Sequence, residues 1–421
     1  MKLAVIGGGS TYTPELADGI GRLLPDAAEL VLVDPDPDRL AVVGPVSARI
    51  MAAHGHPARV RWTGSLDDGT DGADAIVIQL RIGGQAARQR DETWPLDCGC
   101  VGQETTGAGG LAKALRTVPV ILDLAERSSR RASPSAFLID FTNPVGIVTR
   151  ALLSAGYRAV GLCNVAIGFQ RQFASMLGVS PDRVSLGHVG LNHLTWERSV
   201  CVDDLDVLPE LLDKHLDEIA PHTGLTADFI RHLGMVPSYY LRYYYTHDAV
   251  VAEQRGAATR AEEVSRLEAE LLELYADPAL VTKPPQLSQR GGAWYSEAAV
   301  DLLASLTGDR RDVQVVNTAN GLTLPFLPAD AVIEVPARIS SGGAVPVPVA
   351  PVEPLLRGLI AHVYSYEELA LEAAIRGGRD RVYDALLAHP LVGQADRAEC
   401  LTDRLIAENA RHLSWARGDR T

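Results

Sequence analysis

The sequence contains very little lysine. Among 39 basic residues only Lys2, Lys113, Lys214 and Lys283 are lysines, and the rest are arginines. Acidic residues number 53, so the formal net charge at pH 7 is −14. Nucleic acids and anionic membranes are bound by faces rich in basic side chains. The acidic balance therefore argues against a nucleic-acid or membrane-surface binder, but it leaves room for a small anionic substrate held by a few arginines.

Cysteine is also scarce, and long apolar runs are absent from the sequence. Five cysteines in 421 residues, an odd number, argue against a disulfide framework. No stretch approaches the roughly 20 apolar residues of a membrane-spanning helix. The short apolar run at residues 3–6 stops at three glycines and does not form a signal peptide. We therefore expect a cytoplasmic protein with reduced thiols.

Segments typical of strands and helices alternate in the first half of the chain. Short apolar runs rich in β-branched residues predict buried parallel strands at residues 2–7, 29–34, 73–79, 136–140 and 159–162. Helical patterns lie between them, opening at Thr13–Pro14 and covering residues 38–54 and 111–129. This alternation predicts an α/β fold with a Rossmann-like, doubly wound parallel sheet.

The second half is less regular and predicts an α+β substrate domain. Its patterns favour helices at residues 209–219, 262–275 and 354–416, strands at 313–317 and 331–335, and an extended or edge segment at 341–354. The length fits two domains. We place a nucleotide-binding domain at residues 1–165 and a substrate-binding, catalytic domain at residues 166–421, with the boundary between residues 165 and 200.

Glycines follow the first predicted strand directly. Gly7, Gly8, Gly9 and Ser10 occupy the position of a dinucleotide phosphate turn, where the backbone can approach a pyrophosphate and a helix N-terminus offers N–H donors. Asp34 ends the second strand 25 residues after Gly9, where a carboxylate binds the ribose of NAD and disfavours NADP. These features predict an NAD site. The alternative is a tight strand–helix turn without a ligand, since the third glycine of the fingerprint is missing.

A cysteine and a histidine also lie next to predicted apolar segments. Cys163 follows the strand at residues 159–162, and His193 lies thirty residues later. A thiolate and an imidazole can hold a divalent metal and leave positions open for substrate oxygens. On spacing alone the ordinary alternative is favoured, in which the cysteine is a small core residue and the histidine a satisfied polar one.

Eight motifs, in order over nearly the whole chain, resemble those of glycoside hydrolase family 4, the NAD- and divalent-metal-dependent family that includes 6-phospho-glucosidases. They are residues 5–16 (VIGGGSTYTPEL), 81–92 (RIGG with Arg88 and DE), 102–110 (GQETTGAGG), 140–144 (DFTNP), 161–165 (GLCNV), 190–194 (GLNHL), 240–244 (YLRYY) and 290–296 (RGGAWYS). Asn164, directly after the cysteine, is typical of the 6-phospho-β-glucosidase subgroup.

The resemblance implies a role for each matching residue. It implies NAD contacts at Gly7, Gly8, Gly9, Ser10 and Asp34; a metal, normally Mn²⁺ or another divalent ion, at Cys163 and His193; and substrate contacts at Arg88, Asn143, Asn164 and Arg290. Arginine forks match the oxygens of a 6-phosphate. Tyr240 matches the catalytic base, with a phenol pKa that we expect nearby cations to lower. Tyr239 and Tyr243 are alternatives, and so is a purely structural aromatic cluster.

The implied reaction is the hydrolysis of 6-phospho-β-glucosides. It proceeds by oxidation at sugar C3, deprotonation at C2, elimination of the aglycone, addition of water and re-reduction, unlike the two-carboxylate route of most glycosidases. The expected substrate is a phosphorylated disaccharide or aryl glucoside, and the expected assembly is a homodimer or homotetramer. Alternatives are a non-phosphorylated or differently charged glycoside, an NAD-dependent hydroxy-acid dehydrogenase of the lactate/malate type, and an NAD-sensing regulator without catalysis.

Overall fold

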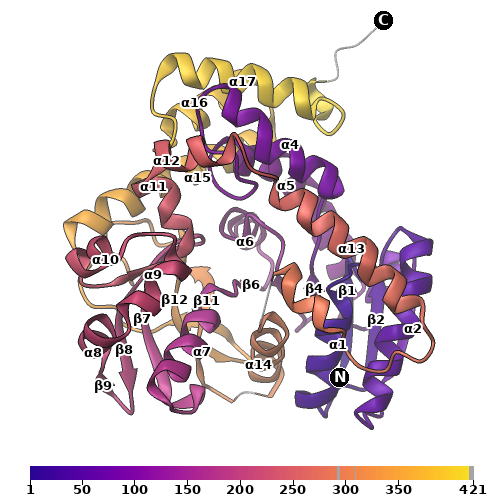
Figure 1. Cartoon of the computed structure of the whole chain (residues 1–421). Coiled ribbons are helices and arrows are strands. Elements are labelled where there is room, and N and C mark those ends of the chain that lie inside the picture. The colour runs from indigo at the N-terminus through magenta and orange to yellow at the C-terminus, as the bar shows by residue number, and fades with distance from the viewer. Residues whose placement is uncertain (292–293, 309, 417–421) are drawn as a thin grey trace, which may run out of the picture.

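A nine-stranded sheet runs through the centre of the molecule (Figure 1), in the order β13-β12-β11-β6-β5-β4-β1-β2-β3. The structure is a computed structural model and describes residues 1–291, 294–308 and 310–416. Six strands are parallel: β1 Lys2–Ile6, β2 Glu29–Val33, β3 Arg59–Thr63, β4 Ala75–Ile78, β5 Phe137–Asp140 and β6 Ala159–Gly161. Five of them fall on the apolar runs that predicted strands, and β3 is an addition.

The parallel strands are buried on both faces. Leu3 and Val5 of β1 contribute to one hydrophobic core, whereas Ala4 and Ile6 contribute to the other. Successive side chains of a strand point to opposite faces, so a strand between two helical layers is apolar at every position. This arrangement explains the uninterrupted apolar runs and confirms the Rossmann-like α/β fold.

Helices cover both faces of the sheet. Helices α3, α5, α6 and α15 supply side chains to one core, and α1, α2 and α14 supply the other. The helices of the first half are α1 Thr13–Leu23, α2 Pro37–Ala53, α3 Leu66–Thr70, α4 Gly84–Asp97, α5 Gly107–Ser129, α6 Val145–Ser154 and α7 Val165–Leu177. In the described residues, no helix has both the length and the apolar character needed to cross a membrane.

The order of the strands reverses beside β1. Strands β2 and β3 lie on one side of it, and β4, β5 and β6 lie on the other. In open α/β sheets, ligands bind at the carboxyl ends of the strands where such a reversal occurs. The glycine turn leaves β1 at this place, so the topology puts it at the expected ligand site.

The sheet continues into the second half of the sequence. Strands β11 Val313–Ala319, β12 Val332–Ser340 and β13 Gly343–Pro346 add to β6 in antiparallel orientation, starting with the pair Asn317–Gly161. They cover the edge that the three-residue strand β6 would otherwise expose. The domain boundary at residues 165–200 stays a prediction, and one sheet spans both sides of it.

The rest of the second half forms a small second sheet and a series of helices. The small sheet comprises β7 Val184–Leu191, β8 Leu194–Val202, β9 Leu205–Asp206 and β10 Val236–Pro237. The helices are α8 Leu208–Lys214, α9 Leu216–Thr223, α10 Ala227–Leu233, α11 Arg242–Tyr245, α12 His247–Gln254, α13 Arg260–Ala276, α14 Tyr295–Gly308, α15 Pro354–Arg376, α16 Arg379–Ala388 and α17 Ala395–Asn409, with short 3-10 turns at Pro181–Arg183, Tyr239–Leu241, Pro285–Arg290 and Ser414–Ala416. The helix predicted at 209–219 is thus divided at His215, and the tail consists of three helices.

One disulfide corrects the expectation that all thiols are reduced. Cys98, which caps the end of α4, is bonded to Cys400 on α17, 302 residues away in the sequence. Helix α17 packs against α4 at the top of the view in Figure 1. Cys100, Cys163 and Cys201 are free. The spacing of the cysteines held no indication of this pair, because only the folded chain brings α17 back to α4.

Removing the disulfide should destabilise the fold. We expect Cys400→Ser to lower the free energy of unfolding by about 2–4 kcal/mol, since the bridge closes a long loop and restricts the unfolded chain. Urea denaturation without reductant measures the change, and Cys201→Ser, at a free thiol, serves as the matched control. Equal stability of the two variants would show that the bridge contributes nothing.

Candidate active site

The glycine turn is shaped by contacts that a larger residue would not allow. Gly7 has φ +87°, and a Cβ there would lie 2.3 Å from the carbonyl oxygen of Gln79. At Gly8 a Cβ would lie 2.6 Å from Cβ of Leu32, and at Gly9 it would lie 2.9 Å from the carboxyl carbon of Asp34. Only glycine fits these positions. The backbone of Gly7, Gly8 and Gly9, which we call the glycine cradle, is therefore not covered by side chains of its own at the point where the strand order reverses.

Asp34 holds the turn from the end of β2. One of its carboxylate oxygens accepts the Gly9 N–H at 3.0 Å, and the other accepts the Asp36 N–H at 3.0 Å. The side chain of Arg39 donates to the carbonyl of Gly9 at 2.8 Å. The following helix α1 has Tyr12 as its N-cap, and no side chain caps the helix. Its first N–H groups and the glycine cradle fit an anionic pyrophosphate.

His193 lies in the two-residue turn between β7 and β8, with φ +62°. Its ring is buried and stacks on Tyr240, with ring centroids 3.6 Å apart and planes at 8°. Nδ1 lies 2.8 Å from the Thr105 hydroxyl, and burial lowers the pKa of His193 to about 4. A neutral imidazole whose Nδ1–H is bound by a hydroxyl presents the Nε2 lone pair to a metal.

Cys163 is buried directly after β6. Burial and the nearby Glu334 carboxylate raise the pKa of the Cys163 thiol, and hydrogen bonds from Val165 and Asn192 oppose this only in part. A bound cation stabilises the thiolate, which is the form that binds metals. Within the described parts of the chain, no third His, Cys, Asp or Glu completes a metal cluster. A cysteine–histidine pair therefore fits a metal with open positions for substrate oxygens.

A buried polar network supports both metal-ligand candidates. Glu334 accepts from Asn192, in the same turn as His193, at 2.9 Å and from Asn317 at 2.9 Å. His188 lies 3.1 Å from Glu334 and 2.6 Å from Glu197. Burial alone would lower the pKa of His188, but these two carboxylates raise it to about 10. The network ties the turn to β11 and β12. Sequence reasoning missed it, because its members come from four strands and one turn, which only the folded chain brings together.

Arg88 and Tyr240, two of the predicted site residues, lie in the same cavity. Both line a cavity of about 430 Å³ that also includes Tyr239, Tyr243 and Arg260. They reach it from α4 and from the 3-10 turn before α11, respectively. The aromatic residues pack closely around it, with the rings of Tyr240 and Tyr243 6.3 Å apart.

Acidic residues hold Arg88 in place. Its Nε lies 2.6 Å from Glu92 and 3.1 Å from Glu104. The buried Glu104 also pairs with Arg81 and with Lys113, the latter at 2.7 Å. Three basic side chains, Arg81, Arg88 and Lys113, thus contact Glu104 beside the cavity. Residues 102–110 resemble a family motif, but the sequence alone indicated no role for Glu104 or Thr105.

The structure places the other three predicted substrate residues, Asn143, Asn164 and Arg290, outside the lining of the cavity that holds Arg88 and Tyr240. Asn164 lines a second cavity of about 510 Å³. Arg290 donates to Glu268 at 2.8 Å, and its guanidinium lies 5.9 Å from the ring centroid of Tyr12. The Oδ1 atom of Asn143 is buried and has no hydrogen-bond partner among the described residues, so it is available to a ligand. Residues 292–293 of the 290–296 motif lie outside the described residues.

The pKa of Tyr240 differs from the sequence-based expectation. Burial raises the pKa of this phenol well above its ordinary value, Cys163 raises it further, and the lowering effect of Arg88 is smaller. The neighbouring arginine therefore does not activate the phenol by itself. The stacked position on His193 places Tyr240 beside the candidate metal site, where a divalent cation would stabilise a phenolate.

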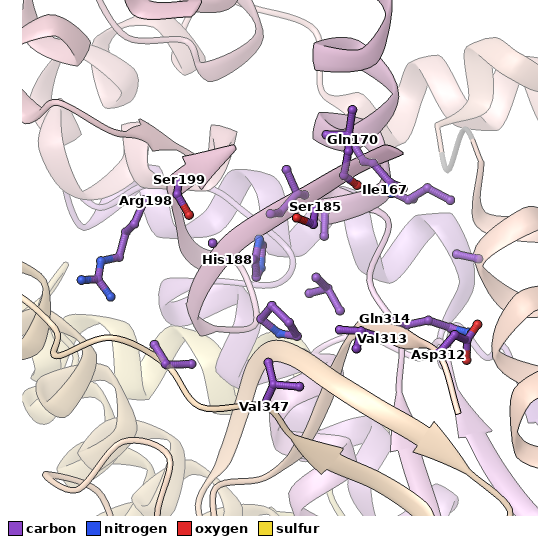
Figure 2. Close-up of a pocket in the computed structure, with 18 of the residues that line it drawn as sticks. Ile167, Gln170, Ser185, His188, Arg198, Ser199, Asp312, Val313, Gln314 and Val347 are labelled. Atoms are coloured by element: carbon purple, nitrogen blue, oxygen red, sulfur yellow. Dashed lines mark hydrogen bonds between the residues drawn. The ribbon is translucent and has the colours of Figure 1, made fainter. Parts of the chain in front are cut away.

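A larger cavity meets this cluster at Cys163. It has a volume of about 790 Å³ and lies between α7, β7 and the strands β11 and β12. Figure 2 shows Ile167 and Gln170 on α7 above it, and Ser185 and His188 on β7. Of the predicted site residues only Cys163 lines it. We therefore place the candidate active site at the tyrosine and arginine cavity.

One histidine near the site predicts sensitivity to acid. His389 is buried between the N–H groups of Gly107 and Leu391, each 3.1 Å from a ring nitrogen, and burial lowers its pKa to about 3. The unfolded chain binds this proton near pH 6.5, so its contribution to stability is present above that pH and is lost as the pH falls towards 3. We expect a loss of about 2 kcal/mol between pH 7.5 and 5. Denaturation of His389→Gln should show a smaller loss, and an equal loss would contradict this assignment.

Family models match both halves of the chain. The model described as "Family 4 glycosyl hydrolase" matches residues 2–179, and the "Family 4 glycosyl hydrolase C-terminal domain" matches residues 188–392. The chain belongs to family 4 of the glycosyl hydrolases. Membership confirms the resemblance and the class of enzyme, and it sets aside the hydroxy-acid dehydrogenase that the first half also suggested.

Relatives of this family 4 hydrolase align with it over nearly its whole length. A probable 6-phospho-beta-glucosidase of Bacillus subtilis is 37% identical, covering 98% of this chain and 97% of its own. A 6-phospho-beta-glucosidase of Escherichia coli is 34% identical, covering 99% and 96%. The solved structure of the 6-phospho-beta glucosidase from Thermotoga maritima, with manganese, NAD+ and glucose-6-phosphate, has a TM-score of 0.92 at 31% identity and covers 98% and 99%.

Proposed function

We propose that this family 4 hydrolase cleaves 6-phospho-β-glucosides with the help of NAD and a divalent metal, normally Mn²⁺. The observation that carries the proposal is the cluster in which Tyr240 stacks on His193 and shares a cavity with Arg88, beside Cys163. The names of the relatives support the choice of substrate. Asn164 after the metal cysteine supports the β-linked subgroup.

The residues present fit both groups. The glycine cradle, the uncapped N-terminus of α1 and Asp34 would hold NAD, and Cys163 with His193 would hold the metal. When bound, NAD accepts and later returns a hydride at sugar C3, and the metal polarises the adjacent sugar oxygens and makes the C2 proton acidic.

The side chains then supply proton transfer and orientation. Tyr240 takes the proton from C2, after which the aglycone leaves from C1 and water adds. Asn164 orients the sugar, since an amide does not donate a proton as an acid does. The hydrogen bond of Thr105 keeps His193 in place beside Tyr240.

Two arginines serve the 6-phosphate. Arg88 lies at the cavity wall, fixed by Glu92 and Glu104, and Arg290 is held by Glu268. A guanidinium that is already oriented loses little freedom when it binds a phosphate oxygen. Asn143, with its free buried Oδ1, would position a hydroxyl of the sugar. The net charge of −14 does not oppose this, because the basic cluster is local.

The substrate is tested with a matched pair of compounds. We expect p-nitrophenyl β-glucoside 6-phosphate to be hydrolysed with NAD⁺ and Mn²⁺, and the unphosphorylated analogue to be hydrolysed at least a hundredfold more slowly. Release of p-nitrophenol measures both. Cleavage of only the unphosphorylated compound would overturn the phosphate assignment and favour a neutral glycoside.

Arg290→Ala should weaken the binding of phosphorylated substrates. A charge-assisted hydrogen bond contributes about 1.5–3 kcal/mol, so we expect KM to rise about tenfold or more while kcat changes little. Steady-state kinetics on the phosphorylated glucoside measures this, with Arg266→Ala, an exposed arginine on α13, as the control. An unchanged KM in Arg290→Ala would remove this arginine from the phosphate site.

Two further properties belong to the proposal. We propose a homodimer or homotetramer, and a cytoplasmic location in which Cys163 stays reduced. Light scattering tests the first. The second rests on the need for a thiolate at the metal, since oxidation of that thiol removes the ligand.

A further inference from the structure

The second cavity, of about 510 Å³, lies beside α7. Its lining includes Asn164, Arg171, Gln172, Tyr239 and Trp294. Two residues connect it to the proposed site. Asn164 directly follows the metal cysteine, and Tyr239 lines both this cavity and the one that contains Arg88 and Tyr240. A group attached to a sugar in the cavity of Arg88 and Tyr240 would enter this space if it extended past Tyr239.

Two exposed aromatic side chains form its walls. Trp294 is 43% exposed and Tyr239 is 40% exposed, and they come from segments 55 residues apart in the sequence. The guanidinium of Arg171 lies 5.0 Å from the ring centroid of Trp294 and is fixed by Glu297. A stacked arginine holds an indole in a defined orientation. Large aromatic residues left accessible at a cavity mark a site of recognition.

The residue beside the metal cysteine also limits which leaving groups can depart. Asn164 occupies the position next to the metal cysteine and does not protonate a departing oxygen. Elimination from C1 then favours an aglycone that is stable as an anion. A phenolate, with a pKa near 10, is a far better leaving group than the alkoxide of a sugar hydroxyl.

Resting on the proposed function, we infer that the cavity beside α7 is an aglycone subsite for aromatic leaving groups. The aryl ring of a β-glucoside 6-phosphate stacks against Trp294 and Tyr239, while the phosphate lies towards Arg88 at the opposite side of Tyr239. The Nε2 group of Gln172 is buried and has no hydrogen-bond partner in the part of the chain that the structure describes, so it is a donor for a polar substituent on that ring. Trp294 is thus a specificity-determining residue outside the proton-transfer machinery.

Kinetics with two substrates tests the inference. We expect the wild type to prefer phenyl β-glucoside 6-phosphate over cellobiose 6′-phosphate. Trp294→Ala should lower kcat/KM for the phenyl compound at least fivefold and change that for the disaccharide less than twofold. Trp294→Phe keeps a ring and should restore most of the loss. Trp62→Ala, at a tryptophan that is 40% exposed on β3, is the matched control and should change neither.

Binding measurements separate this inference from the proposed function. Calorimetry with glucose 6-phosphate should give the same affinity for wild type and Trp294→Ala, whereas an uncleaved phenyl 1-thio-β-glucoside 6-phosphate should bind the variant at least fivefold more weakly. Equal losses on both substrates, no loss on either, or a wild-type preference for the disaccharide would overturn the aryl subsite. If the wild type cleaves neither compound, the proposed function itself fails.

Discussion

Replacing His193 with alanine should abolish both divalent-metal binding and turnover. The structure offers this histidine as a neutral ligand, because burial lowers its pKa to about 4 and Nδ1 is engaged by Thr105. Without it Cys163 remains the only ligand candidate beside Tyr240 among the described residues, and one buried thiol does not hold a metal with open positions. We expect turnover to fall by at least about 10⁴-fold. Metal content after dialysis, measured by elemental analysis, and hydrolysis of the phosphorylated glucoside check the two effects.

Two companion variants sharpen this result. Cys163→Ser should lose metal and activity in the same way, since a hydroxyl at this buried position does not replace the thiolate. His232→Ala, at an exposed histidine of α10, should retain both. NAD binding should persist in all three proteins, because the glycine cradle lies on another part of the sheet. A His193→Ala protein that keeps its metal would disprove the ligand assignment.

Replacing Tyr240 with phenylalanine should slow turnover by about 10²–10⁴-fold, the usual contribution of a general base. The aromatic ring remains and still stacks on His193, so NAD and metal binding should be preserved. Single-turnover kinetics on the phosphorylated glucoside isolates the chemical step.

Tyr243→Phe is the matched control for this variant. The ring of Tyr243 lies 6.3 Å from that of Tyr240, and both tyrosines line the same cavity, so they have similar surroundings. It should retain most of the activity. Normal turnover in Tyr240→Phe together with slow turnover in Tyr243→Phe would assign the base to the second tyrosine.

The first half of the fold was predictable because its information is local. A strand covered on both faces is apolar at every buried position, and residues 3–6 and 30–33 show this directly. The glycine turn was predictable for a related reason, since Gly7 has both a positive φ and a neighbouring carbonyl that exclude a side chain.

Other features depend on the folded chain. His193 lies in a hairpin turn that contains no glycine, so the sequence did not reveal the hairpin. Strands β11–β13 join the first sheet only because β6 leaves an open edge, and Cys400 meets Cys98 only after α17 packs on α4. Burial cannot be read from Tyr240 alone, which is why its raised pKa differs from the expectation.

We expect Tyr240 to remove the C2 proton of a 6-phospho-β-glucoside before the aglycone leaves. Hydrolysis in D₂O with NAD⁺ and Mn²⁺, followed by NMR of the glucose 6-phosphate product, measures whether the hydrogen at C2 exchanges with solvent. Deuterium should be found at C2 in nearly every product molecule, because the proton taken by Tyr240 exchanges with solvent before it returns. Product that carries only protium at C2, formed at full rate, would contradict the elimination mechanism.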